Sequence, residues 1–101
     1  MTTTFEQARQ LALEINAPAW RDLKNRGEYM VADYGYEDAD AWRIVDGARE
    51  LLEGDDYDFE VLDQPITLVM KATGELAHVQ YLEAETRLAA MTPVGDVPVY
   101  E

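Results

Sequence analysis

The chain has 101 residues, the size of one domain built around one hydrophobic core. Its 21 Asp and Glu against 8 Lys and Arg give a net charge of -13, which argues against binding nucleic acid or an anionic membrane through phosphate groups. The absence of Cys excludes disulfides, thiolate nucleophiles and cysteine-ligated metal centres. We therefore expect a single domain over residues 1–101.

The first predicted element is a helix over residues 5–16. Thr4 is a favourable N-cap for it. The apolar residues that follow at helical spacing are Phe5, Ala8, Leu11, Ala12 and Ile15. Because Asn16 tolerates a C-terminal cap conformation and Pro18 disfavours helix in the residue before it, we expect this helix to end at residue 16. Trp20 and Leu23 then fit one short helical turn against the core.

Two strands are predicted next, paired as a hairpin. Residues 28–36 are rich in aromatic and branched side chains, and Gly35 among them indicates a bend or bulge. Residues 37–40 are polar and form the turn.

The second strand of this hairpin begins at Trp42. Its alternation predicts one face made of Trp42, Ile44 and Gly47 and an opposite face made of Arg43, Val45 and Asp46. Residues 48–53 fit either a short helix or a continuation of the strand, and residues 54–56 then break the chain.

A second hairpin is predicted in the latter half of the chain. Phe59, Val61 and Leu62 indicate a short edge segment before it. Residues 66–70 form an apolar run, typical of a strand buried on both faces, and we expect them to be the central strand. A turn with Gly74 at a positive φ then leads into a returning strand over residues 76–82.

A short C-terminal helix is predicted over residues 83–91, where Ala84 and Leu88 recur at helical spacing and Pro93 closes the segment. Residues 93–101 have little to bury, so we expect a mobile tail. Together these elements predict an α+β domain with an antiparallel sheet of about four strands and both helices on one face.

Few residues support catalysis or metal binding. Ser and Cys are absent, which excludes a Ser or Cys triad. His78 lies in a predicted strand with Glu75 nearby, a setting more typical of a surface or half-buried polar residue. Residues 55–60 fail the EF-hand template because Val61 stands where that loop needs Gly, and no phosphate-binding Gly pattern is present. We predict no catalytic residue, no cofactor and no metal.

Negative charge is concentrated in residues 37–63, which hold eleven Asp and Glu against Arg43 and Arg49. Tyr side chains, which are common interface anchors, lie among these acids, whereas Trp42 is expected in the core. The predicted partner-binding residues are Tyr34, Tyr36, Asp38, Asp40, Asp55, Asp56, Tyr57, Asp58 and Glu60. This pattern predicts a docking surface for a basic protein; the alternative is that the acids only keep the chain soluble.

Two stretches also follow a known pattern. Residues 42–55 begin with Trp and end in Gly-Asp, and residues 64–75 contain a Pro, an apolar strand and a closing Thr-Gly-Glu turn. Over residues 29–90 the chain thereby resembles the YrhB-like immunity proteins of bacterial polymorphic toxin systems. The matching residues are Trp42, Leu52, Gly54, Asp55, Pro65, Ile66, Val69, Lys71, Thr73, Gly74 and Glu75. The chain departs from the pattern at residues 63–64 and at Met70. The resemblance implies a small α+β fold that neutralises a cognate toxin without catalysis.

The first functional hypothesis is therefore a non-catalytic, immunity-type inhibitor that covers the basic active site of a toxin. The alternatives are an acidic mimic of nucleic acid that sequesters a DNA-binding protein, and a small hydrolase that uses carboxylates and His78. The expected partner is a basic protein, such as a cognate toxin, with no direct contact to nucleic acid or membrane; a homodimer is left open. No apolar run has the roughly 20 residues of a membrane span, and the N-terminus lacks a signal peptide, so we expect a cytoplasmic protein.

Overall fold

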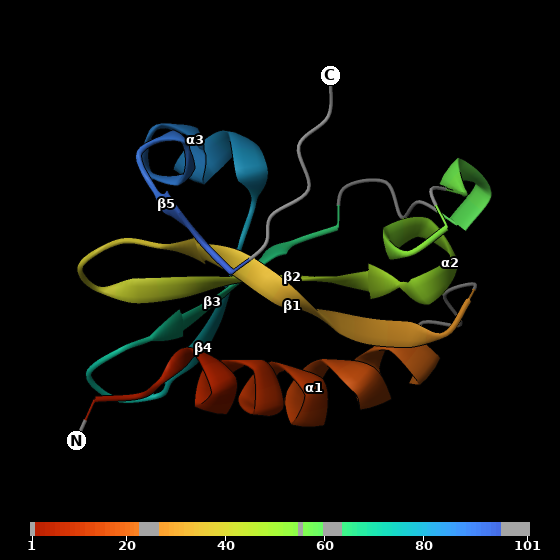
Figure 1. Cartoon of the computed structure of the whole chain (residues 1–101), viewed down its shortest axis with the longest axis horizontal. Coiled ribbons are helices and arrows are strands. Elements are labelled where there is room, and N and C mark those ends of the chain that lie inside the picture. Colours follow the sequence, from red (N-terminus) through yellow and green to blue (C-terminus); the bar gives the residue numbers. More distant parts are fainter. Residues whose placement is uncertain (1, 23–26, 55, 60–63, 96–101) are drawn as a thin grey trace.

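The computed structural model of the chain describes residues 2–22, 27–54, 56–59 and 64–95. The helices are α1 (Phe5–Asp22), α2 (Arg49–Leu52) and α3 (Tyr81–Ala89), with one turn of 3-10 helix, η1 (Tyr57–Phe59). The strands are β1 (Tyr29–Glu37), β2 (Ala41–Ala48), β3 (Ile66–Met70), β4 (Leu76–Val79) and β5 (Thr92–Val94). They form one antiparallel sheet in the order β4-β3-β2-β1-β5 (Figure 1). The predicted α+β class is confirmed, and none of the described helices is long and apolar enough to cross a membrane.

Helix α1 begins at the predicted residue and ends six residues beyond its predicted end. At its start, the Thr4 hydroxyl accepts the Gln7 N–H at 3.1 Å, and the Gln7 side chain accepts the Thr4 N–H at 2.8 Å, which is a capping box. The predicted end at residue 16 is wrong, because the helix continues through the exposed Pro18. The buried residues Ala8, Ala12, Asn16 and Trp20 recur every four positions along the whole helix. Packing of this stripe outweighs the cost of a proline inside the helix.

The first hairpin forms as predicted. Strand β1 pairs with β2 from Tyr29 opposite Ala48 to Glu37 opposite Trp42. The register shifts between Val31 and Gly35, which confirms the expected bulge. The open alternative for residues 48–53 is resolved, since Ala48 ends β2 and helix α2 follows it directly.

Strand β3 is an interior strand, although not the middle one. Its residues Thr67, Leu68 and Val69 are at most 1% exposed, because β2 and β4 flank the strand and a helix covers each face. The expectation that it is central is wrong, since β5 extends the far edge and makes β2 the middle strand. Phe59 lies in η1 rather than in an edge strand, and residues 61–62 fall outside the described part of the chain.

The C-terminal part differs most from expectation. The strand predicted over residues 76–82 ends at Val79, and α3 already begins at Tyr81. This start lets Ala84 and Leu88 pack on the sheet. Pro93 and Val94, expected in the tail, lie in β5 and pair with β1. Residues 96–101 lie outside the described residues.

The two larger helices cover opposite faces of the sheet (Figure 1), which corrects the prediction that both pack on one face. Under α1 the buried residues are Ala8, Ala12, Ile44 and Val69, with the partly buried Phe5, Leu11, Val31, Trp42 and Leu76 around them. Under α3 they are Ala41, Leu68, Leu88 and Met91. The predicted core position of Trp42 is confirmed, and its indole N–H donates to the Thr3 carbonyl at 2.8 Å.

Candidate functional site

The predicted acidic residues lie at two separate places. Asp38 and Asp40 belong to the turn between β1 and β2, whereas Asp56 and Asp58 follow α2, beyond the other end of β2. Figure 1 shows these two places at opposite ends of the sheet. The eight residues of β2 hold them apart, a span of roughly 25 Å at the usual strand rise. Asp55 and Glu60 lie outside the described residues.

Asp38 is occupied by contacts within the chain. One carboxylate oxygen accepts the backbone N–H groups of Asp40 at 2.9 Å and Ala41 at 2.8 Å, which closes the turn. The other oxygen accepts Nε of Arg87 at 2.7 Å. This hydrogen bond from Arg87 lowers the pKa of Asp38 to about 2. Asp38 therefore holds the turn against α3, while the neighbouring Asp40 is exposed.

The predicted tyrosines are distributed differently from the acids. Tyr36 packs against the cluster under α3, and the guanidinium of Arg43 lies 5.2 Å from the centre of its ring. Tyr34 is half-buried within the irregular stretch of β1. Tyr57 opens η1, next to Asp56 and at the other end of the sheet. These tyrosines and the acids therefore do not form one continuous face.

A polar cluster that the sequence reasoning missed lies between α1 and the sheet. The Asp46 carboxylate accepts the Tyr29 hydroxyl at 2.6 Å, the Asn16 amide at 3.1 Å and the Gln64 amide at 3.3 Å. The Asn16 amide nitrogen also donates to the Thr67 hydroxyl at 3.0 Å. Asp46 shares the α1 face with Trp42 and Ile44, so its predicted place on the opposite face is wrong. Side chains alternate along a strand, so Asp46 lies on the same face as Ile44, two residues before it. The prediction missed this because it placed Gly47 on that face instead.

His78 completes this cluster from β4. Its Nε2 lies 2.9 Å from Oδ1 of Asn16. Because the Asn16 NH₂ already donates to two oxygens, its Oδ1 is the acceptor and Nε2 carries the proton. Asn16 thus links the His78 ring to Asp46 by hydrogen bonds. His78 is exposed, in agreement with the expected surface or half-buried position.

Burial determines the protonation of the cluster. It raises the pKa of Asp46 above the usual value, while the hydrogen bonds from Tyr29 and Asn16 act in the opposite direction. Burial and the Asp46 charge also raise the pKa of Tyr29, so its hydroxyl remains a donor. No buried side-chain nitrogen or oxygen in the described part of the chain lacks a partner. The buried polar side chains of this cluster are therefore satisfied by hydrogen bonds within the chain.

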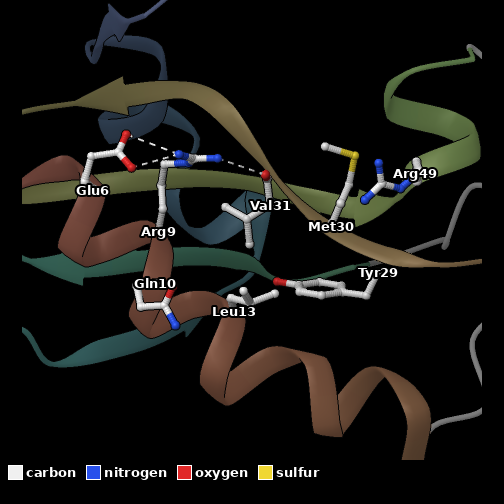
Figure 2. Close-up of a pocket in the computed structure, with 8 residues that line it drawn as sticks. All are labelled: Glu6, Arg9, Gln10, Leu13, Tyr29, Met30, Val31 and Arg49. Carbon is white, nitrogen blue, oxygen red and sulfur yellow. Dashed lines mark hydrogen bonds and ion pairs between the residues drawn. The ribbon is translucent and has the colours of Figure 1, made fainter.

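A surface hollow of about 270 Å³ lies beside the cluster, between α1 and β1 (Figure 2). Arg9 of α1 crosses it, donating from its guanidinium to the carbonyls of Val31 at 3.3 Å and Ala32 at 2.7 Å. The same guanidinium forms an ion pair with Glu6 at 3.0 Å. Arg49 lines the other side of the hollow, as Figure 2 shows. The hollow is thus lined by two guanidinium groups, in contrast to the acidic character of the whole chain.

No group of three or more His, Asp or Glu side chains within the described ranges could hold a metal ion. Comparisons of the chain with protein-family models, with curated proteins and with solved structures found no match.

Proposed function

We propose that the protein is a non-catalytic binding module whose acidic surface captures a basic protein, in the manner of an immunity-type inhibitor that neutralises a toxin. The supporting observation is the exposure of its carboxylates. Those exposed in the described residues are Glu6, Glu14, Asp22, Glu28, Asp33, Asp40, Glu53, Asp56, Asp58, Glu75, Glu83 and Glu85. These exposed carboxylates place at the surface much of the excess of negative charge that results from 21 acids and 8 bases.

Ion pairs within the chain use several of the few bases. Arg9 pairs with Glu6, Lys71 with Glu37 at 2.9 Å, and Arg87 with Asp38, while Arg49 lies near two further carboxylates. The exposed acids together project a negative field toward solvent. Such a field accelerates the association of an oppositely charged protein by about 10- to 1000-fold, which suits an inhibitor that must act before its target does. The resemblance to YrhB-like immunity proteins supports the same proposal.

The test uses the basic partner that co-purifies with the protein from its own host. We expect association to slow at raised ionic strength, and to slow at low ionic strength when Asp56 and Asp58 are both changed to Lys. The matched control is the pair Asp40→Lys and Glu75→Lys at the other end of the sheet, which reports whether one end or both steer the partner. Co-expression should also relieve any toxicity of the partner. Failure to isolate a basic partner, or association rates insensitive to salt and to both variants, would contradict the proposal.

The second candidate function is a mimic of nucleic-acid charge that sequesters a DNA-binding protein. The placement of exposed acids at both ends of the sheet favours it, because a mimic needs carboxylates over much of its length. It predicts that the protein displaces DNA from the partner in a competition assay. A partner that binds this protein and DNA at the same time would exclude the mimic and leave the inhibitor.

A further inference from the structure

The two edges of the sheet are protected to different degrees. Exposed edge strands recruit other chains, and proteins usually block them with short strands, proline, bulges or charged side chains. The edge formed by β1 and β5 uses all four: β5 has three residues and contains Pro93, and β1 is bulged after Val31. The charged side chain of Arg9 donates to the Val31 carbonyl, as Figure 2 shows, and to the Ala32 carbonyl. These features together protect this edge against strand addition.

The opposite edge is β4, which has a neighbouring strand on one side only in the described sheet. Its sequence, Leu76 to Val79, contains no proline, glycine, Lys or acid. Met70 donates its N–H to the Glu75 carbonyl at 2.8 Å, and bonded pairs alternate along an antiparallel ladder. The backbone N–H and C=O groups of Leu76 and His78 therefore point away from β3, toward the open edge.

Exposed apolar side chains lie next to β4. Leu82, at 82% exposure, and Tyr81, at 50%, follow the strand after a single residue. On the other face, Ile15 is 49% exposed and precedes Asn16, whose side chain contacts His78. An extended segment at the β4 edge would thus find main-chain hydrogen-bonding groups flanked by apolar contacts, which is the arrangement used in strand addition.

Charge identifies the kind of segment that fits. The exposed Glu75 and Glu83 lie before and after β4, and Glu14 lines a hollow together with Gly74 of the turn that leads into the strand. The hollow at the β1 edge is instead lined by Arg9 and Arg49. A segment rich in Lys or Arg is attracted to the β4 edge, whereas the two guanidinium groups weaken that attraction at the hollow beside β1. A second copy of this chain, with a net charge of -13, is repelled as well.

We propose that the β4 edge binds an extended, basic segment of the partner protein as an additional strand, with Ile15 and Leu82 in contact with its apolar side chains. This inference rests on the proposed function only in taking the partner to be a basic protein. Beyond that function, the proposal specifies the surface that binds the partner, the β4 edge, and the way it binds, by addition of a strand.

The probe is a short, end-blocked peptide in which Lys alternates with Val, added to the purified full-length protein. Backbone amide resonances should shift at Leu76 and His78, whose N–H groups face the open edge, and at Leu82 and Ile15. The matched peptide in which Glu replaces Lys should produce no shift. Since the natural partner is not used, this result is independent of whether that partner is ever isolated.

Two variants test the contacts separately. Leu82→Ser should weaken binding of the Lys-Val peptide about five- to tenfold, and its matched control is Leu13→Ser, an exposed leucine near the β1 edge. His78→Pro removes an outward N–H and should weaken binding about tenfold or more, whereas His78→Gln keeps that N–H and should bind like the wild type. Leu82→Ser keeps the test valid if His78→Pro does not fold, which circular dichroism would show.

Three outcomes would overturn the inference. The first is the absence of any shift with the Lys-Val peptide, and the second is a set of shifts at the β1 edge or scattered over the acidic residues. The third is a concentration-dependent dimer in sedimentation that the His78→Pro variant abolishes, which would make a second copy the occupant. None of these outcomes decides the proposed function, which is tested separately by the capture of a basic partner and by the salt dependence of its association.

Discussion

The two faces of the sheet are built on different principles. Under α3, Leu68, Leu88 and Met91 form an apolar contact that depends on the area buried. Under α1, the apolar cluster is joined by Asn16, Thr67 and Asp46, whose hydrogen bonds are directional. Burial alone would tolerate a shift of α1 along the sheet, but the bonds of Asn16 fix its position. The α3 face therefore contributes stability through buried area, whereas the α1 face also fixes the position of the helix on the sheet.

The largest effect is expected on the α3 face. Leu68→Ala should lower the free energy of unfolding by about 2–5 kcal/mol, because it leaves a cavity in a fully buried position. Denaturant titration measures this, and Leu82→Ala, on an 82% exposed residue, is the control that should change little. Equal losses in the two variants would mean that α3 does not cover a core.

On the α1 face, Asn16→Ala should lower the free energy of unfolding by about 1–3 kcal/mol, since Asp46, Thr67 and His78 each lose a partner in or beside the interior. Gln10→Ala, which removes an exposed hydrogen bond on the same helix, is the matched control. A loss no greater than that of the control would show that the polar cluster does not hold α1.

The polar cluster also predicts a pH dependence. Because the pKa of Asp46 is raised above the usual value of 3.8, the folded state binds its proton more tightly than the unfolded state. Its contribution to stability is complete below that usual value and is lost as pH rises through the folded pKa. Relative to Asp46→Asn, the wild type should therefore lose stability with rising pH. Parallel stability curves for the two proteins would contradict this.

The smallest effect is expected at the surface pair of Asp38 and Arg87. Arg87→Gln should cost less than about 1 kcal/mol at neutral pH, since the pair is partly exposed. The sign of its pH dependence is opposite to that of Asp46, because the pKa of Asp38 is lowered to about 2. Its contribution is present above about pH 4 and is lost as pH falls toward 2, so wild type and variant should converge there. A difference in unfolding free energy between wild type and Arg87→Gln that grows as pH falls would contradict this prediction.

The sequence predicts what depends on neighbouring residues. The start of α1, the first hairpin with its bulge, the strand over residues 66–70 and the turn at Gly74 all follow from local patterns, and all are confirmed. The errors concern contacts between distant segments. The helix continues through Pro18 because Trp20, two residues later, is buried. Residues 92–94 form a strand only because they pair with β1. Neither contact leaves a local signal.

The candidate site shows the same limit. Sequence proximity predicted one acidic docking surface over residues 37–63, yet β2 separates the turn that holds Asp38 from the segment after α2 that holds Asp56. The open edge of β4 depends on the order of all five strands, which the sequence does not reveal. The neighbouring buried residues Leu68 and Val69 were the available signal for helices on both faces, because adjacent residues of a strand point to opposite sides.

The path of the chain from β4 through α3 to β5 has a consequence for the order of folding. The contact between Thr92 and Glu37 joins residues 55 positions apart, and it is made by a strand of three residues. Closing so long a loop costs chain entropy that so few hydrogen bonds scarcely offset. We therefore expect β5 to dock after both hairpins have formed and to detach first in the native state. The amide of Val94 should exchange its hydrogen with solvent faster than that of Leu68, and the sheet would then fluctuate between five strands and four.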